Sequence, residues 1–235
     1  MVLVVVLVTA QSLFADTQTH AVNYTYSLAV NGDVYPRLHL PAFDDMNGAR
    51  ALTRVNVRVQ ADVSATLAIE NMTGAPLSAW SLEGQHLVFA GFEREDPQVF
   101  GPFAFLGGLF IEPFTATLQP SDGTPRSGPD YLATPASAQV DSTIEMDPKS
   151  LEFFSGGGEV IAVVGPFTEF LLDGATIYDP ELHTGDVAVD FAALAQAGTF
   201  SVTYEFTTVP EPAAGLALAG AATLFVRFRS RRHPH

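Results

Sequence analysis

Apolar and polar side chains alternate along much of this chain, most clearly between Val55 and Ile69. Residues of one parity are apolar: Val55, Val57, Val59, Ala61, Val63, Ala65, Leu67 and Ile69. Residues of the other parity are polar: Arg54, Asn56, Arg58, Gln60, Asp62, Ser64 and Thr66. A dry face and a wet face are typical of an antiparallel strand with one side on a core. Because the run exceeds the usual strand length of about 5–6 residues, we expect a bent strand or two strands broken near residues 61–64.

Shorter runs of the same kind predict further strands. They cover residues 23–30, 85–91, 114–118, 160–164, 187–191 and 199–207. Residues 191–197 are the one helical candidate in the body, and they could equally form a turn between two strands. Many short strands with Gly and Pro between them favour an all-β fold, an antiparallel β-sandwich that is jelly-roll-like or immunoglobulin-like.

Several segments interrupt the alternation. Residues 101–108 (GPFAFLGG) are apolar and Gly-rich, and residues 119–135 predict an exposed Pro/Ser/Gly/Asp loop. The three glycines at 156–158 lack the Lys and helix start of a phosphate-binding loop, so they predict a flexible connection. We expect one sandwich domain over residues 21–207, followed by a linker at 208–212.

Charge and composition narrow the function. The chain has 26 Asp+Glu against 11 Lys+Arg, and four of those basic residues lie after Val209. Such an acidic body should repel nucleic acid, which is therefore not an expected partner. With no cysteine, thiol nucleophiles, Cys-bound zinc and disulfides are excluded.

The N-terminal residues MVLVVVLVTAQSLFA resemble the apolar region of a secretory signal. We assign residues 1–20 to this signal peptide. Ala10 and Ala15 are small residues suited to cleavage, and the mature chain would begin between Asp16 and Ala21. Arg37 is the first basic residue, so the positively charged start is missing and we expect a true start upstream or a weak signal. The alternative is a buried N-terminal strand.

Signatures of catalysis are missing from the sequence. It contains no HExxH and no G-x-S-x-G motif. His39 and His86 flank or occupy predicted strands, and we expect both to face solvent. We therefore predict that the chain is not an enzyme.

Carboxylates keep a secreted hydrolase open as the least favoured alternative. Glu93, Glu95 and Asp96 cluster in one stretch, and Glu145 lies two residues before Asp147. Glycoside cleavage needs two carboxylates about 5–9 Å apart, a separation that the sequence does not fix.

Calcium is the one cofactor that the sequence suggests. Asp44, Asp45 and Asn47 offer oxygen ligands beside Gly48, although the spacing is not that of an EF-hand. A turn rich in Asp and Asn is more often only a turn. The single Trp80 and the 18 phenylalanines show no regular spacing, so an aromatic sugar-binding face stays open.

The C-terminus has three parts in a fixed order. Val209, Pro210, Glu211 and Pro212 come first, an apolar run follows at residues 213–226, and residues 227–235 carry Arg227, Arg229, Arg231 and Arg232. As a helix of about 1.5 Å per residue, the run would cover roughly 21 Å of a hydrocarbon core of about 30 Å. That is short for a permanent transmembrane anchor.

This arrangement resembles the PEP-CTERM sorting signal of exported bacterial proteins. The resemblance implies a short transmembrane helix held transiently in the inner membrane, with the arginines on the cytoplasmic side by the positive-inside rule. It also implies processing near residues 210–212 by an exosortase, after export by the secretion machinery. A simple short membrane anchor is the alternative.

The body resembles the choice-of-anchor E domain, on the stretch LPAFDDMNGARALTRVNVRVQADVSATLAIEN and the closing SVTYEF. That family has no assigned activity, so the resemblance implies architecture and setting alone. We expect a non-enzymatic protein of the cell surface or extracellular matrix, associated with an exopolysaccharide or biofilm envelope. The rival expectation is a carbohydrate-binding or Ca²⁺-dependent adhesion module.

Overall fold

The computed structural model describes residues 15–31, 34–94, 100–172, 175–177, 181–183 and 186–209. Strands account for most of them: β1 (Asp16–Ser27), β2 (Arg37–Pro41), β3 (Arg50–Asn71), β4 (Leu77–Glu93), β5 (Phe100–Leu118), β6 (Tyr131–Glu145), β7 (Glu159–Leu172), β8 (Ala175–Ile177), β9 (Glu181–His183) and β10 (Val187–Thr208). The described helices are single turns: α1 (Leu28–Asn31), a 3-10 turn (Pro148–Ser150) and α2 (Leu151–Phe154). The prediction of an all-β antiparallel fold is confirmed.

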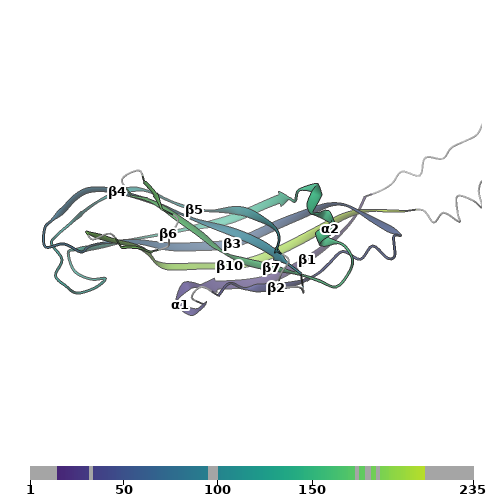
Figure 1. Cartoon of the computed structure of the whole chain (residues 1–235), viewed down its shortest axis with the longest axis horizontal. Coiled ribbons are helices and arrows are strands. Elements are labelled where there is room, and N and C mark those ends of the chain that lie inside the picture. The colour runs from purple at the N-terminus through teal and green to yellow at the C-terminus, as the bar shows by residue number, and fades with distance from the viewer. Residues whose placement is uncertain are drawn as a thin grey trace, which may run out of the picture.

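Within the described ranges, the strands form two antiparallel sheets (Figure 1). Sheet A has the order β1-β10-β3-β6, with β9 beside β10, and sheet B has the order β2-β7-β4-β5, with β8 beside β7. Both sheets contribute to one hydrophobic core, which gives a sandwich-like arrangement. The hydroxyl of Tyr204 in sheet A donates to the carbonyl of Pro41 in sheet B at 3.0 Å, which adds a polar link between them.

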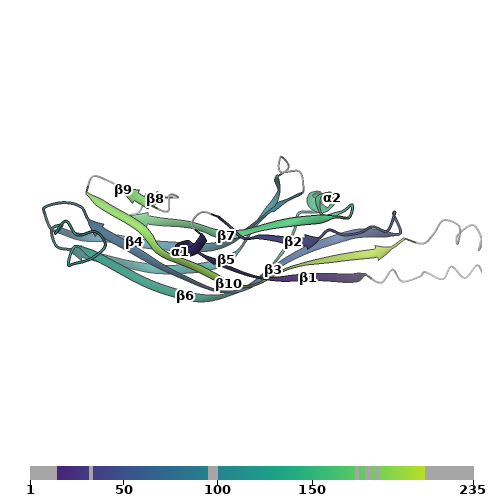
Figure 2. The same cartoon turned by 90° about the horizontal axis from the view of Figure 1, so that it is seen from below.

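The body is long and narrow in both views (Figures 1 and 2). β3 and β10 have 22 residues each, about 70 Å at roughly 3.3 Å per residue. Both curve along their length, as Figure 2 shows. The length follows from uninterrupted alternation, because each added residue pair places another apolar side chain on the core.

The alternation in β3 is confirmed. The eight apolar residues that the pattern placed on one face, from Val55 to Ile69, are all buried. β3 continues through residues 61–64, and its register shifts against β10 lie elsewhere. The expectation of a bent strand therefore holds, and the expectation of a break is wrong.

The helical candidate at residues 191–197 is wrong. These residues lie inside β10, which joins the two strands predicted at 187–191 and 199–207 into one. A register shift between Phe191 and Ala193 marks a β-bulge. The bulge and the alanines that follow it weaken the period-two pattern, which is why the sequence resembled a turn.

The first strand differs from the prediction at both ends. It stops at Ser27, because Leu28–Asn31 form the turn of α1. It starts at Asp16, opposite Phe206 of β10. Residues 16–20, assigned above to the signal peptide, are thus paired with the last strand of the domain.

Two segments that the sequence left irregular belong to strands, and the strand predicted at residues 114–118 is the second part of one of them, β5. Residues 101–108 lie within β5, and residues 131–135 of the predicted loop lie within β6. In β6 only Val140 is buried, and most side chains are small or polar. An edge strand of this kind has few apolar residues on its buried face, so the sequence does not predict it by alternation.

The three glycines at 156–158 form a turn. Their φ angles are +96°, +70° and +77°, a region that favours glycine. The guanidinium of Arg94 donates to the carbonyls of Phe153 at 2.8 Å and Gly157 at 3.1 Å, and also to that of Ser155. The structure thus gives this connection a defined hydrogen-bonded conformation, and its flexibility stays a prediction.

Candidate functional site

Most of the predicted sorting signal lies outside the described residues. Of its motif, Val209 is described, and its backbone N–H donates to the carbonyl of Ala49 at 2.8 Å. Residues 210–235, with Pro210, Glu211, Pro212 and all four arginines, are not described. Within the described ranges, no helix is long and apolar enough to cross a membrane.

The predicted calcium ligands form a tight turn. The carboxylate of Asp44 accepts from the N–H of Met46 at 2.8 Å, and that of Asp45 accepts from the N–H of Asn47 at 3.0 Å. Met46, Asn47 and Gly48 all have positive φ angles. The two aspartates thus stabilise their own turn, and calcium binding at this turn stays a prediction.

The predicted carboxylate clusters form ion pairs with arginines. Glu93 lies 2.5 Å from the guanidinium of Arg37, and Glu145 lies 3.1 Å from that of Arg54. Glu95 and Asp96 lie outside the described residues. In the described part of the chain, no group of three or more His, Asp or Glu side chains is placed to hold a metal ion.

The two histidines differ sharply. His39 is exposed on β2 as predicted, and its Nδ1 lies 2.8 Å from a carboxylate oxygen of Glu159. His86 is completely buried, so the expectation that it faces solvent is wrong. Its Nε2 lies 2.7 Å from the side-chain nitrogen of Gln196, which is also buried. Burial lowers the pKa of His86 to about 4, so this imidazole is neutral at physiological pH.

The outer face of sheet B carries a cluster of aromatic rings, named here the aromatic face: Tyr35, Phe89, Phe103, Phe105 and Phe167. Tyr35 lies at its edge, because its ring also packs against the core and lies 5.7 Å from that of the buried Tyr26 of sheet A. The rings of Phe103 and Phe105 are 5.9 Å apart and those of Phe105 and Phe167 are 5.3 Å apart, both edge to face. Tyr35 meets Phe89 edge to face at 5.7 Å. Phe103 is 70% exposed and Phe105 43% exposed. Phe103 and Phe105 are thus two adjoining exposed rings on this face.

Strand pairing explains why these rings converge. Phe89 of β4 pairs with Phe105 of β5 on one side and with Gly165 of β7 on the other. The ring of Tyr35 covers Gly165, where a Cβ atom would lie 2.7 Å from it. A glycine at this position therefore lets the tyrosine lie flat against the sheet.

Polar side chains continue the aromatic face toward the far end of sheet B. Gln85 pairs with Phe110 on β5 and with Glu169 on β7, and it shares the outward parity of Phe89. Phe110 is 65% exposed. Among the described residues, no side-chain hydrogen bond or ion pair engages Gln85 or Glu169. The face thus combines exposed rings with available hydrogen-bond acceptors.

Sequence reasoning missed this face. In the run from Phe103 to Leu106, Ala104 and Leu106 face the core while the two phenylalanines face out. Because both parities are apolar, the alternation is hidden. Gly107, with a φ of +96°, then shifts the register before Phe110. Trp80, the other aromatic residue singled out, has a side chain outside the described part of the chain.

The outer face of sheet A is polar by contrast. Three adjoining hollows of about 450, 610 and 300 Å³ lie along it, lined by small and polar residues of β3, β6 and β10 such as Ser64, Ser137, Gln139 and Ala195. None of their lining residues is aromatic. Ring stacking on a ligand is therefore available on sheet B and not in these hollows.

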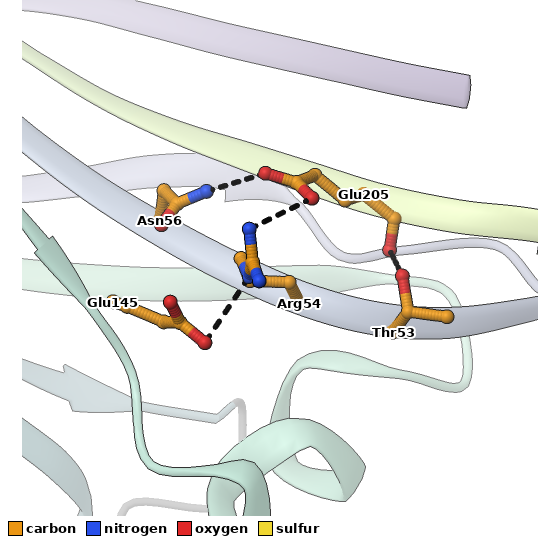
Figure 3. A network of polar contacts seen from close by, with 5 residues as sticks. All are labelled: Thr53, Arg54, Asn56, Glu145 and Glu205. Atoms are coloured by element: carbon orange, nitrogen blue, oxygen red, sulfur yellow. Dashed lines mark hydrogen bonds and ion pairs between the residues drawn. The ribbon is translucent and has the colours of Figure 1, made fainter. Parts of the chain in front are cut away.

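Near the pair of Asp16 and Phe206, sheet A carries the network of Figure 3. Arg54 on β3 lies between Glu145 on β6, at 3.1 Å, and Glu205 on β10, at 3.4 Å. The amide of Asn56 and the hydroxyl of Thr53 also donate to Glu205, to its carboxylate and its carbonyl respectively. Half-exposed ion pairs of this kind add little stability, because solvent screens them.

Comparison with known proteins assigns this chain to no family. No family model and no curated protein matches the chain. Among solved structures, that of infectious bursal disease virus Gx strain is 10% identical, over 92% of this chain and 50% of that chain, with a TM-score of 0.16. The infectious bursal disease virus VP2 subviral particle is also 10% identical over the same shares, with a TM-score of 0.15. The chain spans about half the length of these proteins, and TM-scores this low support no argument.

Proposed function

We propose that this chain is an exported, non-enzymatic protein of the cell surface or extracellular matrix, delivered by an exosortase through its C-terminal signal. The signal consists of Val209 to Pro212, the apolar run 213–226 and the four arginines. The secretion machinery and the exosortase are the partners that this implies, with a transient stay in the inner membrane.

The observation that carries the proposal is the position of Asp16 and Val209, near the first and last described residues. Asp16 pairs with Phe206 at one end of the long sandwich, and Val209 bonds to Ala49 there. A tether that follows Val209 would therefore hold the body by one end. The opposite end, about 70 Å away at strand spacing, would project outward, as suits a surface protein.

The strand order supports a jelly roll over the immunoglobulin-like alternative. Of the eight longest elements in chain order, β1 to β7 and β10, sheet A holds the first, eighth, third and sixth. Sheet B holds the second, seventh, fourth and fifth. This is the order of two interleaved Greek keys, and jelly rolls recur in capsid and lectin domains.

Protease shaving of intact cells tests the proposal. In cells with the exosortase we expect the body to be digested from outside and recovered in the surface or matrix fraction. In exosortase-deleted cells it should remain with the inner membrane. Recovery in the same fraction from both strains would contradict sorting by this route.

The aromatic face favours a second candidate function, binding of a neutral carbohydrate such as an exopolysaccharide. Sugar rings present apolar C–H faces that stack on aromatic rings, and hydroxyl groups at their edges that donate to Gln and Glu side chains. On sheet B, Phe105 offers a ring on which a sugar can stack, and Gln85 offers a side chain that can accept hydrogen bonds from sugar hydroxyls. A purely apolar partner would instead bury Gln85 and Glu169 without hydrogen bonds, which is costly. The acidic body disfavours an anionic polymer.

Affinity electrophoresis through gels with a panel of neutral polysaccharides tests this candidate, with alginate as the anionic comparison. We expect retardation by a neutral polymer, and loss of it in the Phe103→Ala/Phe105→Ala variant. Leu132→Ala, which removes an exposed apolar side chain from β6, is the matched control. Equal retardation of both variants, or none by any neutral polymer, would remove the candidate.

A further inference from the structure

The loop between β5 and β6, at the end of the body opposite Asp16 and Val209, contains a fully buried aspartate. Asp130 is 0% exposed. Its Oδ2 accepts from the N–H of Asp122 at 2.9 Å, but its Oδ1 has no hydrogen-bond partner. A buried carboxylate oxygen without a partner is costly, because it has lost its hydration and gained nothing in return.

A second carboxylate points to the same place. A Cβ atom built on Gly128 would lie 2.5 Å from Oδ2 of Asp122 and 3.0 Å from Oδ1 of Asp130. The two oxygens therefore converge beside Gly128, whose φ of +86° favours glycine. The other oxygen of Asp122 accepts from the N–H of Thr124 at 2.7 Å. Each carboxylate thus uses one oxygen to hold the loop and places the other beside Gly128.

The nearby basic side chain does not neutralise this pair. The guanidinium of Arg126 lies 2.5 Å from Asp190, and its backbone N–H donates to Glu70. Two carboxylates that converge without a described cation between them repel each other, and more strongly where one is buried.

The surrounding loops are held in place independently of any ligand. Asn71, which is fully buried, donates to the carbonyls of Ala75 at 2.8 Å and Gln119 at 2.6 Å. Its own N–H donates to the carbonyl of Asp130 at 2.8 Å. The position of the buried aspartate is therefore fixed by the frame around it.

We propose that Asp122 and Asp130 form a Ca²⁺ site, with Asp122 Oδ2 and Asp130 Oδ1 as its side-chain ligands and carbonyls and water completing the shell. Calcium takes six to eight oxygen ligands in flexible geometry, whereas Mg²⁺ demands a near-ideal octahedron. An exposed loop with two carboxylates suits the affinity of extracellular modules, a Kd of about 10⁻⁴–10⁻³ M. The site is separate from the turn at Asp44 and Asp45, and it does not depend on the sorting proposal.

The test is calcium titration of the full chain after EDTA treatment, followed by calorimetry and thermal unfolding. We expect one Ca²⁺ per chain and a Tm raised by several degrees at 10 mM CaCl2. MgCl2 at the same concentration should shift Tm by less than half as much.

Three variants locate the site. Asp122→Asn, at an exposed residue, should weaken Ca²⁺ binding at least tenfold while the chain still folds. Asp130→Asn should do the same, and Asp45→Asn, which alters the other candidate turn, should bind Ca²⁺ as the wild type does. No binding by the wild type at 10 mM CaCl2 would overturn the proposal. Binding that survives Asp122→Asn but is lost in Asp45→Asn would overturn it too.

Discussion

The side chains of His86 and Gln196 join the two sheets through one buried contact, with 2.7 Å between their Nε2 atoms. His86 lies on β4 of sheet B and Gln196 on β10 of sheet A. With its proton on Nδ1, the imidazole accepts from the amide of Gln196. Protonation would replace that acceptor with a second N–H and place a charge in the core.

Stability should therefore fall as the solution is acidified. The pKa of His86 is lowered to about 4 in the folded chain, against about 6.5 in the unfolded chain. Between these values the unfolded state binds the proton more tightly. The contribution of neutral His86 to the free energy of unfolding is thus complete above pH 6.5. It is lost as pH falls through 4, and the loss amounts to up to about 3 kcal/mol.

Urea unfolding at pH 7 and pH 4 checks this prediction. The His86→Leu/Gln196→Leu variant removes both polar partners and should lose less stability on acidification than the wild type does. His39→Gln, at an exposed histidine, should behave as the wild type. An unchanged pH dependence in the double variant would show that His86 does not set it.

The Gly156–158 turn offers a clean test of backbone strain. Gly157 has a φ of +70°, and a Cβ atom there would meet nothing within 4 Å. Gly157→Ala should therefore cost about 1–2 kcal/mol of unfolding free energy through the backbone alone. Gly74→Ala is the matched control, because that glycine is equally open and lacks a positive φ. Equal effects of the two substitutions on thermal unfolding would refute the explanation.

The start of β1 predicts where a signal peptidase would cut. Residues 16–20 pair with residues 202–206, so cleavage after His20 would remove five paired residues from the sheet. Cleavage after Ala15 would leave the strand whole. We expect Asp16 as the first residue of the secreted chain, as determined by N-terminal sequencing, and a start at Ala21 would contradict this.

The ion pairs of Figure 3 should contribute little. The side chain of Arg54 is 48% exposed, and those of Glu145 and Glu205 are 53% and 25% exposed. Solvent screens such pairs, so Arg54→Ala should change the unfolding free energy by less than about 1 kcal/mol. A loss above 2 kcal/mol in chemical unfolding would mean that the network holds the three strands together.

The sequence predicted those strands in which one face is apolar and buried and the other is polar and exposed to solvent. β3 is the clear case, because every second residue from Val55 to Ile69 is apolar and buried. β6 was not predicted because only Val140 is buried there. Of β5, the part at residues 114–118 was predicted, and the first part was not, because Phe103 and Phe105 are as apolar as the core residues between and beside them. In both strands the two faces do not differ clearly in polarity, so the alternation of apolar and polar residues is weak. Pairing with neighbouring strands decides the structure there.

The candidate sites were harder to predict than the fold. The aromatic face joins residues from β4, β5, β7 and the segment before β2, which only the sheet order brings together. Asp122 and Asp130 are eight residues apart in a loop full of polar side chains. Their convergence beside Gly128 depends on the path of the loop, which the sequence does not express.

The mature C-terminus, determined by intact mass spectrometry, tests the central claim most directly. The chain should be compared from cells that have the exosortase and from cells that lack it. We predict that the chain from the first ends near residues 210–212, without the arginine tail, while the chain from the second still carries that tail. An intact arginine tail in both would contradict delivery by this route.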